Sequence, residues 1–159
     1  AMSRVETFQL ALGEEPGAMD LYDFADADGS TQASLSRDAV ALYAKDLLAH
    51  PVVVTSLDAF LSEYAIERIA LLKVDTEGAD IKVLRGARHA ILASRIDLIQ
   101  FEFIDANVAT RTTMRDFFEA LPGYRISRLC LNGDEWPLEY SVKYCEVPVS
   151  QNLIARPIR

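Results

Sequence analysis

The chain has 159 residues, 50% hydrophobic and 25% charged, which is enough for one compact domain and unlike a disordered or fibrous protein. Its formal net charge of -8 would repel a phosphate backbone, so we expect no nucleic-acid partner. No stretch approaches the roughly 20 apolar residues that span a bilayer, so we expect a soluble, cytoplasmic protein with no membrane partner.

The first part of the chain predicts short extended runs separated by turns. Pro16 and Gly17 favour a tight turn, and the apolar spacing from Val40 to Leu48 is helical, with Asp38 as a possible cap. Ala1, which precedes Met2, is interpreted as a cloning remnant. The expected elements are a hairpin over 5–24, a mobile loop over 25–37, a helix over 38–49, a strand over 52–57 and a helix over 58–64.

The middle of the chain predicts a strand, a helix and a second strand over about 35 residues. The run "IALLKVD" at 69–75 is evenly apolar, which is typical of a strand covered on both faces. A helical pattern over 77–94 leads to "DLIQFEF" at 97–103, and such a unit pairs its strands in parallel. The single α/β domain over 1–159 would therefore hold a mostly parallel sheet.

The last part predicts a helix over 112–121 and an antiparallel C-terminal hairpin. The strand "YRISRLCL" precedes Asn132-Gly133, a common hairpin turn, and "NLIARP" at 152–157 would form the last strand. Cys130 and Cys145 lack C-x-x-C spacing and only two histidines are present, far apart, so neither a zinc site nor a disulfide is indicated. We expect both cysteines to be reduced and half-buried in strands.

Carboxylates follow both central strands. Asp75, Glu77 and Asp80 surround Gly78 after the first, and Glu102 and Asp105 end the second, at the sheet edge where α/β proteins bind ligands. The alternative is structural: Asp75 would cap a helix, and Glu77 and Asp80 would occupy its first turn. The residues leave both interpretations open, although Glu102 within "LIQFEF" favours a polar site, because an unpaired buried charge is costly.

The stretches "LLKVDTEGADIKVLRGA" and "IDLIQFEF" resemble the FkbM family of methyltransferases, and "ALGEEPGAMDLY" and "SLDAF" also fit its pattern. The resemblance implies a Rossmann-like methyltransferase fold, S-adenosylmethionine as cofactor, and transfer of a methyl group to a hydroxyl of a small molecule or sugar. By position it implies Asp75, Glu77 and Glu102 as catalytic residues, with Ala11 and Leu12 against the cofactor. A carboxylate there could orient the hydroxyl and accept its proton.

One part of the family pattern is missing. Family members carry a glycine-rich loop after a strand and then an acid that binds the cofactor ribose, whereas the seven glycines of this sequence never form Gly-x-Gly. The chain thus resembles the C-terminal part of a methyltransferase, and we expect it to bind S-adenosylmethionine weakly or not at all. With two central strands absent, the strand at 69–75 would be left as an open edge, to be covered either by residues 5–12 of the same chain or by a second chain; we expect a homodimer.

Two other functions remain open. The chain could be a non-catalytic remnant that serves as an oligomerising or ligand-binding module. It could also be a metal-dependent enzyme that uses Asp75, Glu77 and Glu102 as oxygen ligands. We rank the metal enzyme lowest, because one turn does not supply six ligands.

Overall fold

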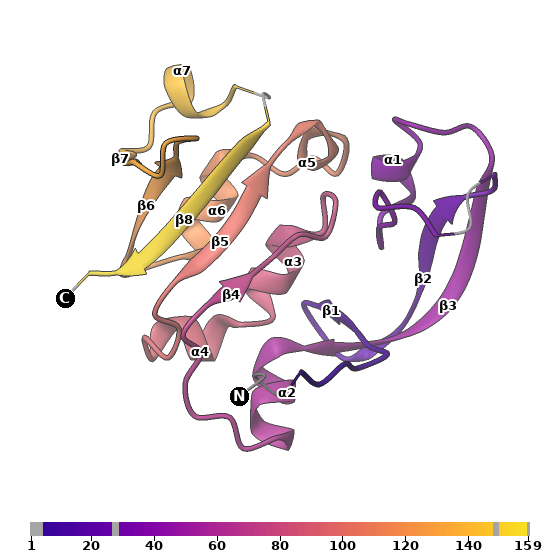
Figure 1. Ribbon diagram of the computed structural model, residues 1–159, viewed down its shortest axis with the longest axis horizontal. Coiled ribbons are helices and arrows are strands. Elements are labelled where there is room, and N and C mark those ends of the chain that lie inside the picture. The colour runs from indigo at the N-terminus through magenta and orange to yellow at the C-terminus, as the bar shows by residue number, and fades with distance from the viewer. Residues whose placement is uncertain (1–4, 27–28, 148–149, 159) are drawn as a thin grey trace.

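The computed structural model describes residues 5–26, 29–147 and 150–158, and it is an α/β structure with two separate sheets (Figure 1). The smaller sheet has the order β1-β3-β2, and the larger has the order β4-β5-β8-β6-β7. Their strands are β1 (Ala11–Gly13), β2 (Gly17–Phe24), β3 (Leu47–Ser56), β4 (Leu72–Lys73), β5 (Ile99–Phe103), β6 (Tyr124–Leu129), β7 (Glu135–Pro137) and β8 (Gln151–Pro157).

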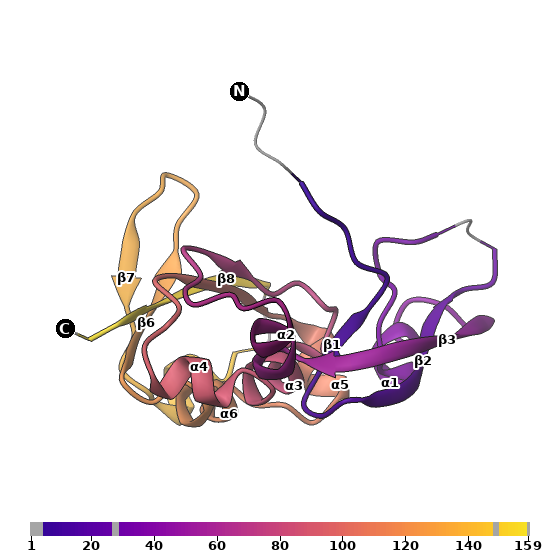
Figure 2. The ribbon, with the colours of Figure 1, turned by 90° about the horizontal axis from the view of Figure 1, so that it is seen from below.

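Short helices cover one face of the larger sheet. Figure 2 shows α3, α4 and α6 on the same side of β8 and β6. The helices are α1 (Arg37–Val40), α2 (Leu57–Glu63), α3 (Asp80–Arg85), α4 (Arg88–Leu92), α5 (Asp105–Ala109), α6 (Met114–Ala120) and α7 (Val142–Cys145). None of the described helices is long and apolar enough to cross a membrane.

The main core lies between these helices and the larger sheet. Alternate residues of β5, namely Ile99, Phe101 and Phe103, are buried toward the helices, as the two-residue period of a strand requires. Phe101 stacks on Phe117 of α6, with 4.8 Å between the ring centroids. The predicted parallel pairing of the two central strands is confirmed, since Leu72 of β4 pairs with Ile99.

The predicted hairpin over 5–24 is wrong. Strands β1 and β2 do not pair with each other, because β3 lies between them, parallel to β1 and antiparallel to β2. The predicted helix over 38–49 is wrong beyond its first turn, since α1 ends at Val40 and β3 begins at Leu47. Eight residues of β2 pair along β3, and this long-range pairing outweighs the local helical spacing.

The prediction of a mostly parallel sheet is also wrong. Among the described strands, β1·β3 and β4·β5 are parallel and the other four pairs are antiparallel. The prediction that the strand at 69–75 is covered on both faces is wrong as well, because Leu71 is 53% exposed. The helix expected over 77–94 is divided at Gly86, where a Cβ would lie 2.0 Å from the carbonyl oxygen of Gly13.

Other predicted elements are confirmed. The helix over 58–64 matches α2, the helix over 112–121 contains α6, and the last strand matches β8. The Asn132-Gly133 turn joins the antiparallel strands β6 and β7, with Gly133 at φ 86°. Cys145 lies in α7, and Cys130 follows β6, so the expectation of cysteines within strands is wrong.

Residues 27–28 of the predicted mobile loop lie outside the described residues. In the rest of that segment, Ser34 forms a β-bridge to Tyr22, and Ser36 caps α1 by accepting a hydrogen bond from the Ala39 amide. These contacts connect residues 34–36 to β2 and to α1.

Candidate functional site

A groove of about 1020 Å³ lies between the smaller sheet and the end of β4. Its walls are mostly apolar and come from residues 8–12, which lead into and begin β1, from Leu21 of β2, from residues 33–35 and from residues 50–53 of β3. Ala11 and Leu12, the residues predicted to face a cofactor, belong to this wall, and Asp75 and Thr76 close one end. An apolar groove with a few polar groups is typical of small-molecule sites.

The turn after β4 has an unusual backbone. Glu77 has φ 49° and Gly78 has φ 89°, both in the left-handed region. A Cβ on Gly78 would lie 2.8 Å from the carbonyl oxygen of Ala106 in α5. The chain therefore needs glycine at position 78 so that this turn can pack against α5. This packing brings Glu77 near Glu102 and Asp105, the acids at the end of β5 and just after it.

Asp75 lies at the groove with an exposed side chain. Its carboxylate forms an ion pair with Lys73, and the two side chains are 40% and 53% exposed respectively. The hydrogen bond that the Lys73 ammonium donates to Asp75 raises the pKa of that ammonium. Asp75 is not the predicted helix cap, because the N-cap of α3 is Ala79, without a side-chain hydrogen bond.

Glu77 and Glu102 are half-buried, and the pKa of each is raised. Burial is the largest cause for both, and repulsion from the Asp75 carboxylate comes next. Repulsion from the charges of Glu102, Asp80 and Asp105 also raises the pKa of Glu77. The structure thus brings the predicted carboxylates of the two strand ends into one electrostatic cluster.

Asp80 is the deepest of these acids, with only 1% of the residue exposed. One carboxylate oxygen accepts hydrogen bonds from the Gly78 amide at 3.2 Å and from Nδ2 of Asn107 at 3.4 Å. The other oxygen has no hydrogen-bond partner among the described residues, and neither does the buried hydroxyl of Thr76. Burial raises the pKa of Asp80. As the structural alternative predicts, Asp80 is in the first turn of α3, but Glu77 precedes the helix, so that part of the alternative is wrong.

Several polar residues around the cluster were not predicted from the sequence. The Tyr43 hydroxyl donates to Asp105 at 2.6 Å, and the Ser34 hydroxyl donates to the Thr76 carbonyl at 3.2 Å. Asn107 accepts from the Ile104 amide at 2.8 Å while it donates to Asp80. Asn107 lies three residues after Ile104, the N-cap of α5, and this spacing is a weak capping signal. Nothing in the nearby sequence indicates the other contacts.

The described residues contain no group of three or more His, Cys, Asp or Glu side chains arranged to hold a metal ion. The candidate site is therefore the apolar groove with Asp75 in its lining, together with Glu77 and Glu102, on which the Asp75 charge acts.

Comparison with known families gives one match. The model described as "Methyltransferase FkbM domain" matches residues 3–126, well over half of the chain. Neither the curated proteins nor the solved structures give a match.

Proposed function

Because the chain belongs to the FkbM methyltransferase family, we propose that it carries the transfer site of an O-methyltransferase that acts on a hydroxyl of a small molecule or sugar. The observation that supports this most is that Asp75 lines one part of an apolar groove and that its charge acts on Glu77 and Glu102, the acids near the same strand ends. The acceptor would lie in the groove with its hydroxyl toward these carboxylates.

The electrostatics of the cluster suit proton transfer. A general base works best when its pKa lies near the working pH, and burial and mutual repulsion raise the pKa of Glu77 and of Glu102 in that direction. Asp75, with Lys73 beside it, would orient the hydroxyl. Glu77 would then accept the hydroxyl proton as the oxygen becomes methylated.

The family's cofactor, S-adenosylmethionine, supplies the methyl group when bound. The groove residues fit part of this molecule: Ala11 and Leu12 offer an apolar wall, and Asp75 offers a carboxylate near a sulfonium cation. Apart from Asp75, the described groove lining includes no carboxylate that could bind the ribose hydroxyls.

The larger sheet supports a Rossmann-like origin for the fold. Strand β4, helices α3 and α4, and strand β5 form a parallel crossover unit, and the carboxylates lie at the carboxyl ends of its strands. We propose that the β4-β5-β8-β6 order is one half of a Rossmann-like sheet.

The test is substitution by isosteric amides. With labelled S-adenosylmethionine supplied in large excess, because this chain is expected to bind it weakly, we expect Asp75→Asn and Glu77→Gln to lower methyl transfer to a panel of sugars and polyketide alcohols by about 10²-fold, with little change in melting temperature. Glu135→Gln is the matched control, since Glu135 forms a surface ion pair with Arg156 at 3.0 Å, far from the groove in the fold. Unchanged turnover with a lowered melting temperature would assign the two acids a structural role.

A second candidate is a non-catalytic oligomerising or ligand-binding module. The observation that favours it is the incomplete larger sheet, in which β4 pairs with β5 alone among the described strands. Binding of panel alcohols without any methyl transfer, in the presence of S-adenosylmethionine, would favour this candidate.

A further inference from the structure

Gln32 lies where the segment before α1 meets the turn that follows β4. Its side-chain amide donates a hydrogen bond to Oε1 of Glu77 at 3.4 Å. Across the part of the chain that the structure describes, no other residue donates a hydrogen bond to the Glu77 carboxylate. Gln32 therefore supplies the favourable polar contact of the acid that would accept the acceptor's proton.

The backbone around Gln32 is held from both sides. The Gln32 backbone amide donates to the Ser30 hydroxyl at 3.2 Å, and Ser30 donates from its own amide and hydroxyl to the buried carboxylate of Asp23. On the other side, the Ser34 hydroxyl donates to the carbonyl oxygen of Thr76 at 3.2 Å. Figure 1 shows the segment before α1 opposite the turn between β4 and α3. The Gln32 side chain thus extends from a fixed backbone.

The backbone of Glu77 is fixed as well. Its φ of 49° places it in the left-handed region, in the turn that Gly78 packs against α5. The side-chain torsions of Glu77 can still direct the carboxylate toward the groove or toward solvent. Gln32 immediately precedes residues 33–35 of the groove wall, so its hydrogen bond selects the direction toward the groove.

The acids around Glu77 oppose its ionisation. Burial is the largest cause of its raised pKa, and repulsion from Asp75, Glu102, Asp80 and Asp105 adds to it. A hydrogen bond donated to a carboxylate favours the ionised form, and it does so without adding a charge when the donor is an amide. A neutral donor therefore keeps the carboxylate available as a base while its pKa stays above the ordinary value.

Two further titratable groups lie near the same acids, and both already have partners. The Tyr43 hydroxyl donates to Asp105 at 2.6 Å, and the Lys73 ammonium forms an ion pair with Asp75. Neither of them donates to Glu77. The contact with Gln32 is thus not duplicated by the other groups around the cluster.

We propose that Gln32 is a positioning residue, whose side-chain amide holds the Glu77 carboxylate ionised and directed toward the groove. This inference rests on the proposed function, in which Glu77 accepts the proton of the acceptor hydroxyl. Gln32 acts through Glu77 and does not itself contact the reacting atoms. Without the amide, Glu77 faces only repulsion within the cluster, so its carboxylate takes up a proton more readily.

The experiment follows the ionisation of Glu77 directly, by carbon NMR of chain labelled at the glutamate carboxyl carbons, with Glu77→Gln used to assign the signal. Gln32→Ala removes the donor, and Gln32→Glu replaces it with a carboxylate of nearly the same size. Thr31→Ala is the matched control, because Thr31 is the exposed neighbour of Gln32 in the same segment. We expect the titration midpoint of Glu77 to move to higher pH in Gln32→Ala, to move further in Gln32→Glu, and to keep its wild-type value in the control.

Methyl transfer with S-adenosylmethionine in large excess gives a second readout. We expect Gln32→Ala to lower turnover near neutral pH by about tenfold and to displace the acid limb of the pH profile in the same direction as the Glu77 signal. A merely structural role of Gln32 would lower the melting temperature and leave both the Glu77 midpoint and the pH profile unchanged, and that result would contradict the proposal.

A Glu77 midpoint that is unchanged or lowered in both Gln32 variants would overturn the proposal. Because the NMR titration does not depend on catalysis, a raised midpoint in a chain that transfers no methyl group would support the positioning contact and count against the proposed function. Methyl transfer by the wild type, together with a Glu77 titration that does not respond to Gln32, would overturn the positioning role alone.

Discussion

Gly78 fixes the shape of the turn that gathers the carboxylates. We expect Gly78→Ala to lower the free energy of unfolding by about 2 kcal/mol or more, since an alanine there needs φ 89° and a Cβ 2.8 Å from a backbone oxygen. Gly17→Ala is the control, because a Cβ at Gly17 meets nothing within 4 Å, and its effect should stay within about 0.5 kcal/mol. Equal effects of the two substitutions in urea unfolding would contradict this account.

Asp80 makes stability depend on pH. Its folded pKa is raised above the ordinary value of 3.8, so the folded state binds the proton more tightly than the unfolded state does. Ionisation therefore destabilises the fold as the pH rises from about 4 through the raised value, and the full penalty applies above it.

Replacement of Asp80 by Asn removes this charge and keeps a carbonyl oxygen for the Gly78 amide. We expect the Asp80→Asn variant to be more stable than the wild type at pH 8, because burial penalises the ionised carboxylate there. Below pH 4 the difference should vanish. Thermal unfolding at several pH values provides the measurement, and a constant difference between pH 4 and 8 would show that Asp80 is not the titrating group.

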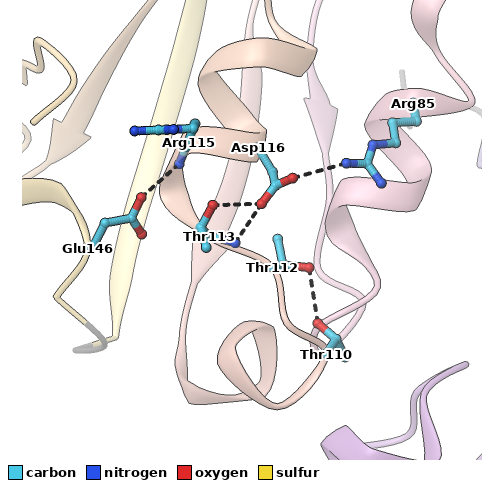
Figure 3. Close-up of polar contacts among 7 residues, drawn as sticks. All are labelled: Arg85, Thr110, Thr112, Thr113, Arg115, Asp116 and Glu146. Carbon is cyan, nitrogen blue, oxygen red and sulfur yellow. Dashed lines mark hydrogen bonds and ion pairs between the residues drawn. The ribbon is translucent and has the colours of Figure 1, made fainter. Parts of the chain in front are cut away.

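At the scale of single elements, helix α6 is held at its start by two carboxylates (Figure 3). Asp116 accepts from the amide and hydroxyl of Thr113, at 2.8 and 2.7 Å, and forms an ion pair with Arg85 at 3.1 Å. Glu146, from the segment after α7, accepts from the amides of Met114 and Arg115 at 2.8 and 3.0 Å. These contacts satisfy amides that a helix leaves unpaired in its first turn.

We expect Glu146→Ala to lower the free energy of unfolding by about 1 to 2 kcal/mol, the range of a lost N-terminal cap. Glu119→Ala is the control within the same helix, because Glu119 is exposed, and its effect should lie within about 0.5 kcal/mol. Urea unfolding of both variants provides the comparison. Similar values for the two would mean that the Glu146 contacts add little to the stability of α6.

Elements with a strong local pattern were the ones that the sequence predicted correctly. Strand β5 alternates clearly, α2 begins at the Ser56 cap, and the β6–β7 turn has its Asn-Gly pair. The start of β3 and the separation of β1 from β2 were missed, because both depend on pairing between residues far apart in the chain. No local pattern carries that information.

The same distinction applies to the site. The sequence predicted that Asp75, Glu77 and Glu102 lie near one another, because these residues lie near the ends of two strands. Neighbouring parallel strands end at the same edge of a sheet. The groove could not be predicted, because its walls come from five separate places in the chain between Phe8 and Thr76. The buried partner Asn107 was missed for a similar reason, because its contact with Asp80 spans 27 positions.

At the scale of the whole molecule, cofactor affinity tests how complete the site is. We expect the isolated chain to bind S-adenosylmethionine with a dissociation constant weaker than about 1 mM, because Asp75 is the only carboxylate in the described groove lining and the sequence has no Gly-x-Gly loop. Isothermal titration calorimetry measures this directly. Micromolar binding would contradict the prediction and would mean that other residues hold the ribose.

The order of the larger sheet has a consequence for how the chain folds during its synthesis. Strand β8, which lies beyond the residues that match the family, sits between β5 and β6. Until residues 151–157 leave the ribosome, β5 and the β6–β7 hairpin have no common neighbour, and the buried side of β5 lacks Leu153 and Ala155. Contacts across some 50 residues form slowly. The sheet is therefore completed last at its centre, and the unfinished chain exposes apolar side chains of β5 late in synthesis.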